Sequence, residues 1–235
     1  SYTFFEYRKS QNEGSYGQGE SAPFTLKVEN IDHFRIEHAQ DPVELKKTGD
    51  NWQMVKPVQD EVEEASVLSA ILALTTQRVR QFGEEGAADW AKYGLAPPQA
   101  VFELGSSGKT ESISISEKHA FDGSFYLRSK DELLMGETGF AQVSARSSNS
   151  FRSRQLYRES KPPEKIEMQF EKQKYTLVKN GATWSIEPDP GFTVDAGKIN
   201  NWVEQFLEFK PAELVKDDPS EEERRGYLLV VPSIK

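Results

Sequence analysis

The chain has 235 residues, and its 29 basic against 38 acidic side chains give a net charge of −9. We expect no nucleic-acid partner, because an acidic surface repels polyanions. The sequence contains no cysteine, which excludes disulfides, thiol catalysis and cysteine-based zinc sites. It also lacks a run of 18 apolar residues, which excludes a membrane-spanning helix within the chain.

The first 21 residues differ from the rest. Four aromatic and two basic side chains crowd the first nine positions, namely Tyr2, Phe4, Phe5, Tyr7, Arg8 and Lys9. Aromatic residues followed by basic ones are typical of the end of a membrane span, and the polar, Gly- and Ser-containing stretch after them is typical of a flexible linker. We therefore expect residues 1–21 to be a juxtamembrane stub and linker behind an anchor upstream of residue 1. An ordinary N-terminal strand is the alternative.

Residues 34–57 have the pattern of a three-stranded meander. Apolar and polar residues alternate over residues 34–38 and again over 43–47, and this period of two predicts half-buried strands. A turn at residues 49–51 leads into a third strand with Trp52 on its inner face, and Pro57 ends the sheet.

The next stretch predicts helices and then more strands. Apolar residues recur at helical spacing between Val67 and Val79. A second, short helix is expected over residues 86–93. Gly105 to Gly108 predicts a hairpin turn, and Ile113 and Ile115 alternate with serines as in a strand with one polar face. Two more strands are expected at 125–128 and 132–135, followed by a helix across residues 139–150.

The sequence repeats itself after 132 residues. This shift pairs Trp52 with Trp184 and Gly49 with Gly181, and it places apolar residues on apolar residues in constant phase. The second copy predicts a helix that follows Asp195 and carries Trp202 at a core phase, then a short helix that starts at Asp218-Pro219. We infer an internal duplication whose second copy lacks the later strands of the first.

Candidate chemistry is sparse. The three histidines, His33, His38 and His119, are scattered, and no nucleophile-elbow, dinucleotide or phosphate-loop motif occurs. Most carboxylates stand in runs beside predicted helix starts, where solvated acids complement the helix dipole. We therefore expect no catalytic, metal or cofactor-binding residue, and no cofactor.

Two features suggest contact with a partner. Trp90 corresponds to Glu222 in the second copy, so we expect it to be partly exposed; local packing is the alternative. The only concentrated basic stretch of the acidic chain could receive an acidic partner or neutralise a helix C-terminus, and it contains Arg146, Arg152, Arg154 and Arg158.

The order of the motifs resembles a known family. The motifs are Gly49-Asp50-Asn51-Trp52, Tyr93-Gly94-Leu95 before Pro97-Pro98, Phe125-Tyr126-Leu127-Arg128 and Phe151-Arg152-Ser153-Arg154-Gln155-Leu156. In these the chain is similar to the domain-of-unknown-function family numbered 4340, over roughly residues 24–235. The resemblance implies an extracytoplasmic or periplasmic protein with one N-terminal membrane anchor, often encoded beside gliding-motility-type ABC transporters. It implies no catalytic residues.

We expect an α+β fold of two related units, each an antiparallel sheet with packed helices, the second unit incomplete. The expected division is residues 1–21 as stub and linker, 22–158 as the first unit and 159–235 as the second.

On function, we expect a non-enzymatic binding or scaffold module, anchored to the inner membrane and accessory to an ABC-type transporter. Its partner would be a membrane protein or transporter component. A glycan-type ligand-binding module that uses exposed aromatic residues is the alternative, followed by a carboxylate-based hydrolase.

Overall fold

A computed structural model gives the fold of two compact units, Ser1–Ser153 and Arg154–Lys235. The boundary between them lies five residues before the one expected from the sequence. The structure describes residues 19–38, 41–82, 89–155, 161–170, 173–188, 191, 194–212, 214, 217, 220 and 223.

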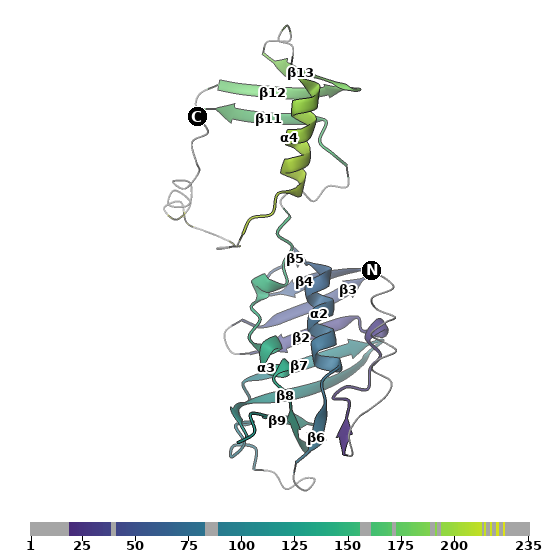
Figure 1. Ribbon diagram of the computed structural model, residues 1–235, viewed down its shortest axis with the longest axis vertical. Coiled ribbons are helices and arrows are strands. Elements are labelled where there is room, and N and C mark those ends of the chain that lie inside the picture. The colour runs from purple at the N-terminus through teal and green to yellow at the C-terminus, as the bar shows by residue number, and fades with distance from the viewer. Residues whose placement is uncertain are drawn as a thin grey trace. The chain divides into compact units, whose positions relative to one another are not determined.

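The first unit is built on one antiparallel sheet of ten strands, in the order β1-β6-β10-β9-β8-β7-β2-β3-β4-β5 (Figure 1). The strands are β1 Glu20–Ser21, β2 His33–Glu37, β3 Val43–Thr48, β4 Asn51–Lys56, β5 Asp60–Glu61, β6 Val79–Gln81, β7 Ala100–Ser106, β8 Lys109–His119, β9 Phe125–Ser129 and β10 Glu132–Gly136. Residues 20 and 21, which the sequence analysis placed in the linker, thus form an edge strand paired with β6.

One face of this sheet is covered by helix α2 (Glu64–Thr75) and by the short helices α3 (Gly139–Ser144) and η2 (Ser148–Ser150) (Figure 1). The turn η1 (Val28–Asn30) also contacts α2. Alternating strand residues point to this face, and the side chains that meet there are fully buried, among them Phe34, Phe102 and Phe140. Burial of such side chains stabilises the unit by about 1.5–3 kcal/mol each.

The described part of the second unit contains a three-stranded antiparallel sheet and helix α4. Its elements are β11 Lys165–Phe170, β12 Gln173–Asn180, β13 Thr183–Glu187 and α4 Ala196–Glu208, with strand order β11-β12-β13. Asp195 caps α4 by accepting a hydrogen bond from the backbone N–H of Lys198 at 3.1 Å. Leu177, Trp184 and Val203 form the centre of a small core.

The 132-residue shift found in the sequence reproduces the strand register, except at an irregularity in β3 where Glu44 pairs with Lys56 while its counterpart Thr176 pairs with Glu187. In the first unit Phe34 pairs with Leu45, and Leu45 with Met54; in the second, Ile166 pairs with Leu177, and Leu177 with Ile186. These are the residues 132 positions further along the chain.

The turns and helices of the two units follow the same shift. Gly49 and Gly181, the first residues of corresponding turns, have φ values of 63° and 64°, a conformation that glycine adopts at least cost. Helices α2 and α4 begin at corresponding residues, Glu64 and Ala196. The two units therefore share one strand–strand–strand–helix motif.

The expected α+β class, with helices packed on each sheet, is wrong, because the protein is mostly β. Strands β8, β9 and β10 and the very short β1, β5 and β6 extend one sheet to ten strands, whereas the described residues contain three α-helices. The expected helix across residues 139–150 is interrupted at residues 145–147 and divides into α3 and η2. The expected helix over residues 86–93 is wrong over its described part, because residue 89 is irregular and residues 90–93 form a turn. The expected helix from Asp218 lies largely outside the described residues.

Candidate functional site

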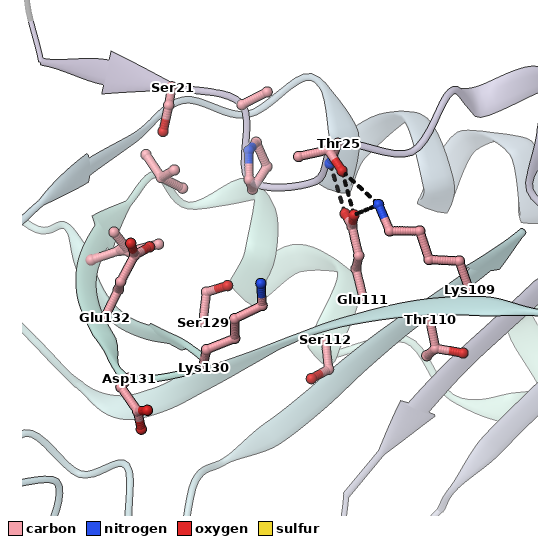
Figure 2. A pocket seen from close by; sticks show the side chains of 14 residues that line it. Ser21, Thr25, Lys109, Thr110, Glu111, Ser112, Ser129, Lys130, Asp131 and Glu132 are labelled. Atoms are coloured by element: carbon pink, nitrogen blue, oxygen red, sulfur yellow. Dashed lines mark hydrogen bonds and ion pairs between the residues drawn. The ribbon is translucent and has the colours of Figure 1, made fainter. Parts of the chain in front are cut away.

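The first unit contains an open cleft of about 690 Å³ at the end of the β9–β10 hairpin. The N-terminal part of strand β8 extends beyond its pairing with β9. The last pair at that end is Ser114 opposite Arg128. Residues 109–112 therefore have a strand neighbour on one edge, β7, and face the hairpin turn on the other. The segment 21–25 closes the opposite side of the cleft (Figure 2).

Glu111 ties the N-terminal segment to β8. Its carboxylate accepts hydrogen bonds from the backbone N–H of Thr25, at 2.7 Å, and from the Thr25 hydroxyl, and it forms an ion pair of 2.7 Å with Lys109 (Figure 2). Burial alone would raise the pKa of Glu111, but the hydrogen bonds from Lys109 and Thr25 outweigh it, so this pKa lies below its ordinary value. The carboxylate is therefore ionised at neutral pH and fixes one wall of the cleft.

The hairpin turn places Lys130 in the cleft. Lys130 has a φ of 55°, and its side chain reaches into the hollow beside Ser129 (Figure 2). Arg128 holds the turn from the other side: its Nε donates to the Lys130 carbonyl oxygen at 2.8 Å, and its guanidinium lies 4.3 Å from the ring centroid of Trp90. Trp90 thus supports the turn through Arg128 and lies outside the cleft lining.

The lining combines polar side chains and charges of both signs with the apolar residues Ala22, Pro23, Val79 and Leu134. Hydroxyl groups come from Ser21, Thr110, Ser112 and Ser129, and the charged groups are Lys109, Lys130, Glu111, Asp131 and Glu132. In Figure 2, Lys109 and Glu111 extend toward Thr25, whereas Thr110 and Ser112 lie on the other side of β8. Such a wall can donate and accept several hydrogen bonds at once, which suits a small ligand with many hydroxyl or amide groups.

The described arginines of this stretch contact groups within their own units. The Arg146 guanidinium donates to the Ser66 carbonyl oxygen at 3.0 Å and to Ser69 Oγ at 3.2 Å, and burial lowers its pKa. Arg152 is mostly buried, and its Nε lies 2.6 Å from Asp60 Oδ2. Both side chains therefore hold the 146–152 segment against the first unit.

The other two arginines belong to the second unit. Arg154 donates from its guanidinium to the carbonyl oxygen of Ala212 at 2.6 Å. Arg158 lies outside the described residues.

Half-exposed aromatic rings form a second feature of the first unit. Tyr93 and Tyr126 have ring centroids 5.0 Å apart, and Phe82 lies 5.7 Å from Tyr126 and 6.1 Å from Tyr93. Phe82 and Tyr93 pack edge to face at 86°, and the other two pairs are tilted at 48° and 60°. The rings pack on each other and do not present one flat platform.

Sequence reasoning missed the cleft, because its walls come from three segments far apart in the chain. The one available signal was the polar alternation around Ile113 and Ile115, since Ser112 lies on the cleft wall. The described residues contain no group of three or more His, Asp or Glu side chains that could hold a metal ion. Among the helices in the described part of the chain, none has the length and apolar character needed to span a bilayer.

Comparison with known proteins gives one match. The family model of a domain of unknown function, DUF4340, matches residues 52–227. No curated protein and no solved structure matches the chain. The matched region covers parts of both units.

Proposed function

The chain belongs to the DUF4340 family, and we propose that it acts as a binding module whose cleft takes a small ligand rich in hydroxyl groups, of saccharide type. The observation that carries this proposal is the cleft between residues 109–112 and the 129–132 turn, whose lining includes hydroxyls and both signs of charge.

Three features support binding at this place. The cleft volume of about 690 Å³ lies within the range of small-molecule sites. The wall is held in place before any ligand arrives, because Glu111 fixes the Thr25 segment and Arg128 fixes the turn. Pre-formed polar groups bind more tightly, since less conformational entropy is lost on binding.

The ligand class follows from the hydrogen-bonding groups. Ser and Thr hydroxyls both donate and accept, the Lys130 ammonium donates, and the Asp131 and Glu132 carboxylates accept. A saccharide carries hydroxyl groups on most of its carbons, and each hydroxyl both donates and accepts, so it can use all three kinds of group. Among the described residues, no aromatic side chain lines the cleft, so we expect binding that is weak and dominated by hydrogen bonds.

An NMR titration tests the proposal. The full chain, labelled with ¹⁵N, is titrated separately with maltose, cellobiose and N,N′-diacetylchitobiose up to tens of millimolar. We expect at least one sugar to shift amide signals of residues 109–112 and 129–132. If none of the three shifts these signals, or if shifts occur only elsewhere, the saccharide proposal fails.

Two variants and one control sharpen the test. Ser112→Trp fills the cleft and is expected to abolish the shifts. Lys130→Gly removes the ammonium at a residue whose positive φ glycine accepts readily, and it is expected to weaken binding several-fold. Ser107→Gly is the matched control, because Ser107 also has a positive φ, of 50°, in a turn outside the cleft lining. It should bind sugar as the wild type does.

The broader part of the proposal is a non-enzymatic, membrane-anchored, extracytoplasmic role as accessory to an ABC-type transporter. The support is the resemblance to the family together with the aromatic and basic residues at positions 2–9, which themselves lie outside the described residues. Fractionation of cells that express the full-length gene tests this part. The protein should be found in the membrane fraction and should be cleaved by protease added to spheroplasts; a protein protected inside the cytoplasm would contradict it.

A further inference from the structure

The backbone of β8 also borders the cleft, and the direction of its hydrogen-bonding groups can be assigned. Strands β7 and β8 are joined by the two-residue turn Ser107-Gly108, whose φ values of 50° and 83° are both positive, as in a type I′ turn. The residues that flank such a turn, Ser106 and Lys109, form a hydrogen-bonded pair. Because the two kinds of pair alternate along antiparallel strands, the backbone groups of odd-numbered residues from Lys109 to Ile115 face β7.

Two hydrogen bonds outside the β7–β8 ladder agree with this assignment. The carbonyl oxygen of Ile115 accepts from the backbone N–H of Gln99, which directly precedes β7, at 2.9 Å. The carbonyl oxygen of Gly105 accepts from the backbone N–H of Asp32, at 3.0 Å, and so points away from β8. Even-numbered residues in this part of β8 therefore direct their backbone groups to the edge opposite β7.

Thr110 and Ser112 are the two even-numbered residues that line the cleft. Their side chains lie on the other side of β8 from those of Lys109 and Glu111 (Figure 2). The part of Thr110 and Ser112 that faces the hairpin turn is therefore the strand edge, with its N–H and C=O groups. The described part of the chain places the cleft along this stretch of the edge, and the pairing with β9 begins only at Ser114.

The cleft lies where β9 would continue. Strand β9 pairs with β8 as far as Arg128, which is opposite Ser114. The same register would place Lys130 opposite Ser112, but the chain turns at Lys130, with a φ of 55°, and continues as β10. The place beside Ser112 that a peptide group of a longer β9 would take is thus part of the cleft.

An acetamido group has the hydrogen-bonding groups of one peptide unit. It is planar and trans, so its N–H and C=O point in opposite directions. The N–H can donate to the Ser112 carbonyl oxygen, while the C=O accepts from the ammonium of Lys130, which reaches into the hollow from the hairpin turn (Figure 2). The reverse orientation would set two donors, N–H and ammonium, against each other, so one orientation is favoured.

The methyl group of an acetamido group also has apolar neighbours in the cleft. Ala22 and Pro23 come from the N-terminal segment, Val79 from β6 and Leu134 from β10. Apolar surface favours a methyl group over a hydroxyl group. A sugar hydroxyl at the same position supplies no methyl group, and its single oxygen is too short to reach both walls.

We propose that the ligand of the cleft is a sugar with an N-acetylated amino group, bound between the Ser112 carbonyl oxygen and the Lys130 ammonium. The inference rests on the proposed function and names the ligand class of the same site. Such a sugar is neutral, so the net charge of −9 on the chain does not repel it.

Two disaccharides with the same linkage test the inference. N,N′-diacetylchitobiose differs from cellobiose by acetamido groups in place of the 2-hydroxyl groups. In NMR titrations of the full chain, labelled with ¹³C and ¹⁵N, we expect diacetylchitobiose to bind about three- to tenfold more tightly. Equal affinity for both sugars would overturn the acetamido inference and leave the saccharide proposal standing. Binding of neither sugar, nor of maltose, would reject the saccharide proposal itself.

Backbone carbonyl signals locate the contact. The ¹³C signal of the Ser112 carbonyl should move downfield with diacetylchitobiose and stay in place with cellobiose, because only the former donates an N–H to it. The carbonyl of Glu111 is the internal control, since it already faces β7. Equal movement of both carbonyl signals, or no movement of the Ser112 signal, would contradict the contact.

A variant of the opposite wall tests the second hydrogen bond. Lys130→Gly removes the donor to the acetamido C=O and keeps the positive φ, so the preference for diacetylchitobiose over cellobiose should fall below about twofold. Ser107→Gly, in the turn outside the cleft lining, is the matched control and should keep the full preference. A full preference in Lys130→Gly would overturn the role given to its ammonium.

A peptide offers the same amide group, and a third ligand separates the two sources. N-acetyl-dialanine N-methylamide is titrated under the same conditions. Weaker binding of this peptide than of diacetylchitobiose supports the sugar as the ligand. If the peptide binds as tightly or more tightly and displaces the sugar, the site belongs to a peptide and the inference is overturned.

Discussion

The two units share a motif and a strand register but differ in what surrounds the motif. In the first unit, strands β2, β3 and β4 lie within a ten-stranded sheet, and helices α2, α3 and η2 cover one face of it. In the described part of the second unit, the corresponding strands form a sheet of three strands, accompanied by helix α4. Local sequence therefore determines the motif, and the added segments determine how much of it is buried.

The helices show this difference most directly. Residues at corresponding positions of α2 and α4 have the same spacing, yet Leu74 is fully buried and Phe206 is 44% exposed. An amphipathic pattern identifies the side of a helix that faces a sheet. It does not identify which turns of the helix extend past the last strand.

Replacement of the corresponding tryptophans should have the largest effect, and it should be similar in the two units. Trp52 is 5% and Trp184 is 6% exposed, and the indole N–H of Trp184 also donates to Asn200 Oδ1 at 2.8 Å. Trp52→Ala and Trp184→Ala should each lower the free energy of unfolding of their unit by about 3–5 kcal/mol. Urea denaturation, with hydrogen exchange to show which unit opens, measures this. A loss below about 1 kcal/mol in either variant would contradict equivalent burial.

Alanine substitutions at the corresponding positions 74 and 206 should change the free energy of unfolding by different amounts in the two units. Leu74→Ala leaves a cavity in a packed core and should cost about 2–5 kcal/mol. Phe206→Ala removes a half-exposed ring and should change the free energy of unfolding by less than about 0.5 kcal/mol. Urea denaturation of the two variants provides the comparison. Comparable losses would show that Phe206 contributes to a packed core as Leu74 does.

Part of the fold was predictable from the sequence. The two glycines at turns and the alternation of apolar residues specified the meander and its register, because a slip of one residue would expose the whole inner face. Strands β1, β5 and β6 have two or three residues each, which is too short for a period of two to be visible. Trp202 was expected in the core and is 42% exposed, since the sequence does not reveal where the sheet beneath it ends.

The cleft was beyond sequence reasoning for a different reason. It depends on Thr25 and Glu111, 86 positions apart, being held together by hydrogen bonds. It also depends on β8 being longer than its neighbour β9. Neither relation has a local pattern. The arginine stretch was a visible pattern, but Arg146 and Arg152 contact Ser66 and Asp60 of their own unit.

The ion pairs of Glu44 give a smaller contribution to stability, which is confined to the first unit. Its carboxylate lies within 3.4 Å of His33, Lys46 and Lys56, and the hydrogen bond from Lys46 is the main cause that lowers its pKa from 4.5 to about 2. The folded-state pKa is the lower one, so this stabilisation is present above about pH 4.5 and is lost as the pH falls toward 2. The corresponding residue in the second unit is Thr176.

Glu44→Gln should therefore lower the free energy of unfolding by about 2–3 kcal/mol at pH 7. The difference between variant and wild type should shrink between pH 4.5 and pH 2. Urea denaturation across this range measures it, with the exposed Glu29→Gln as control. A difference that does not depend on pH would show that the ion pairs around Glu44 contribute little.

The shared register is the central claim, and nuclear Overhauser effects between strands test it most directly. Residues opposite each other outside a hydrogen-bonded pair have Cα atoms about 4.5 Å apart, so their Hα protons give a strong effect. His33 opposite Lys46 and Lys165 opposite Val178 are such pairs, and they are related by the 132-residue shift. We predict a strong Hα–Hα effect for both pairs. An effect that links Lys165 to a residue of β12 other than Val178 would contradict the claim that both units have the same register.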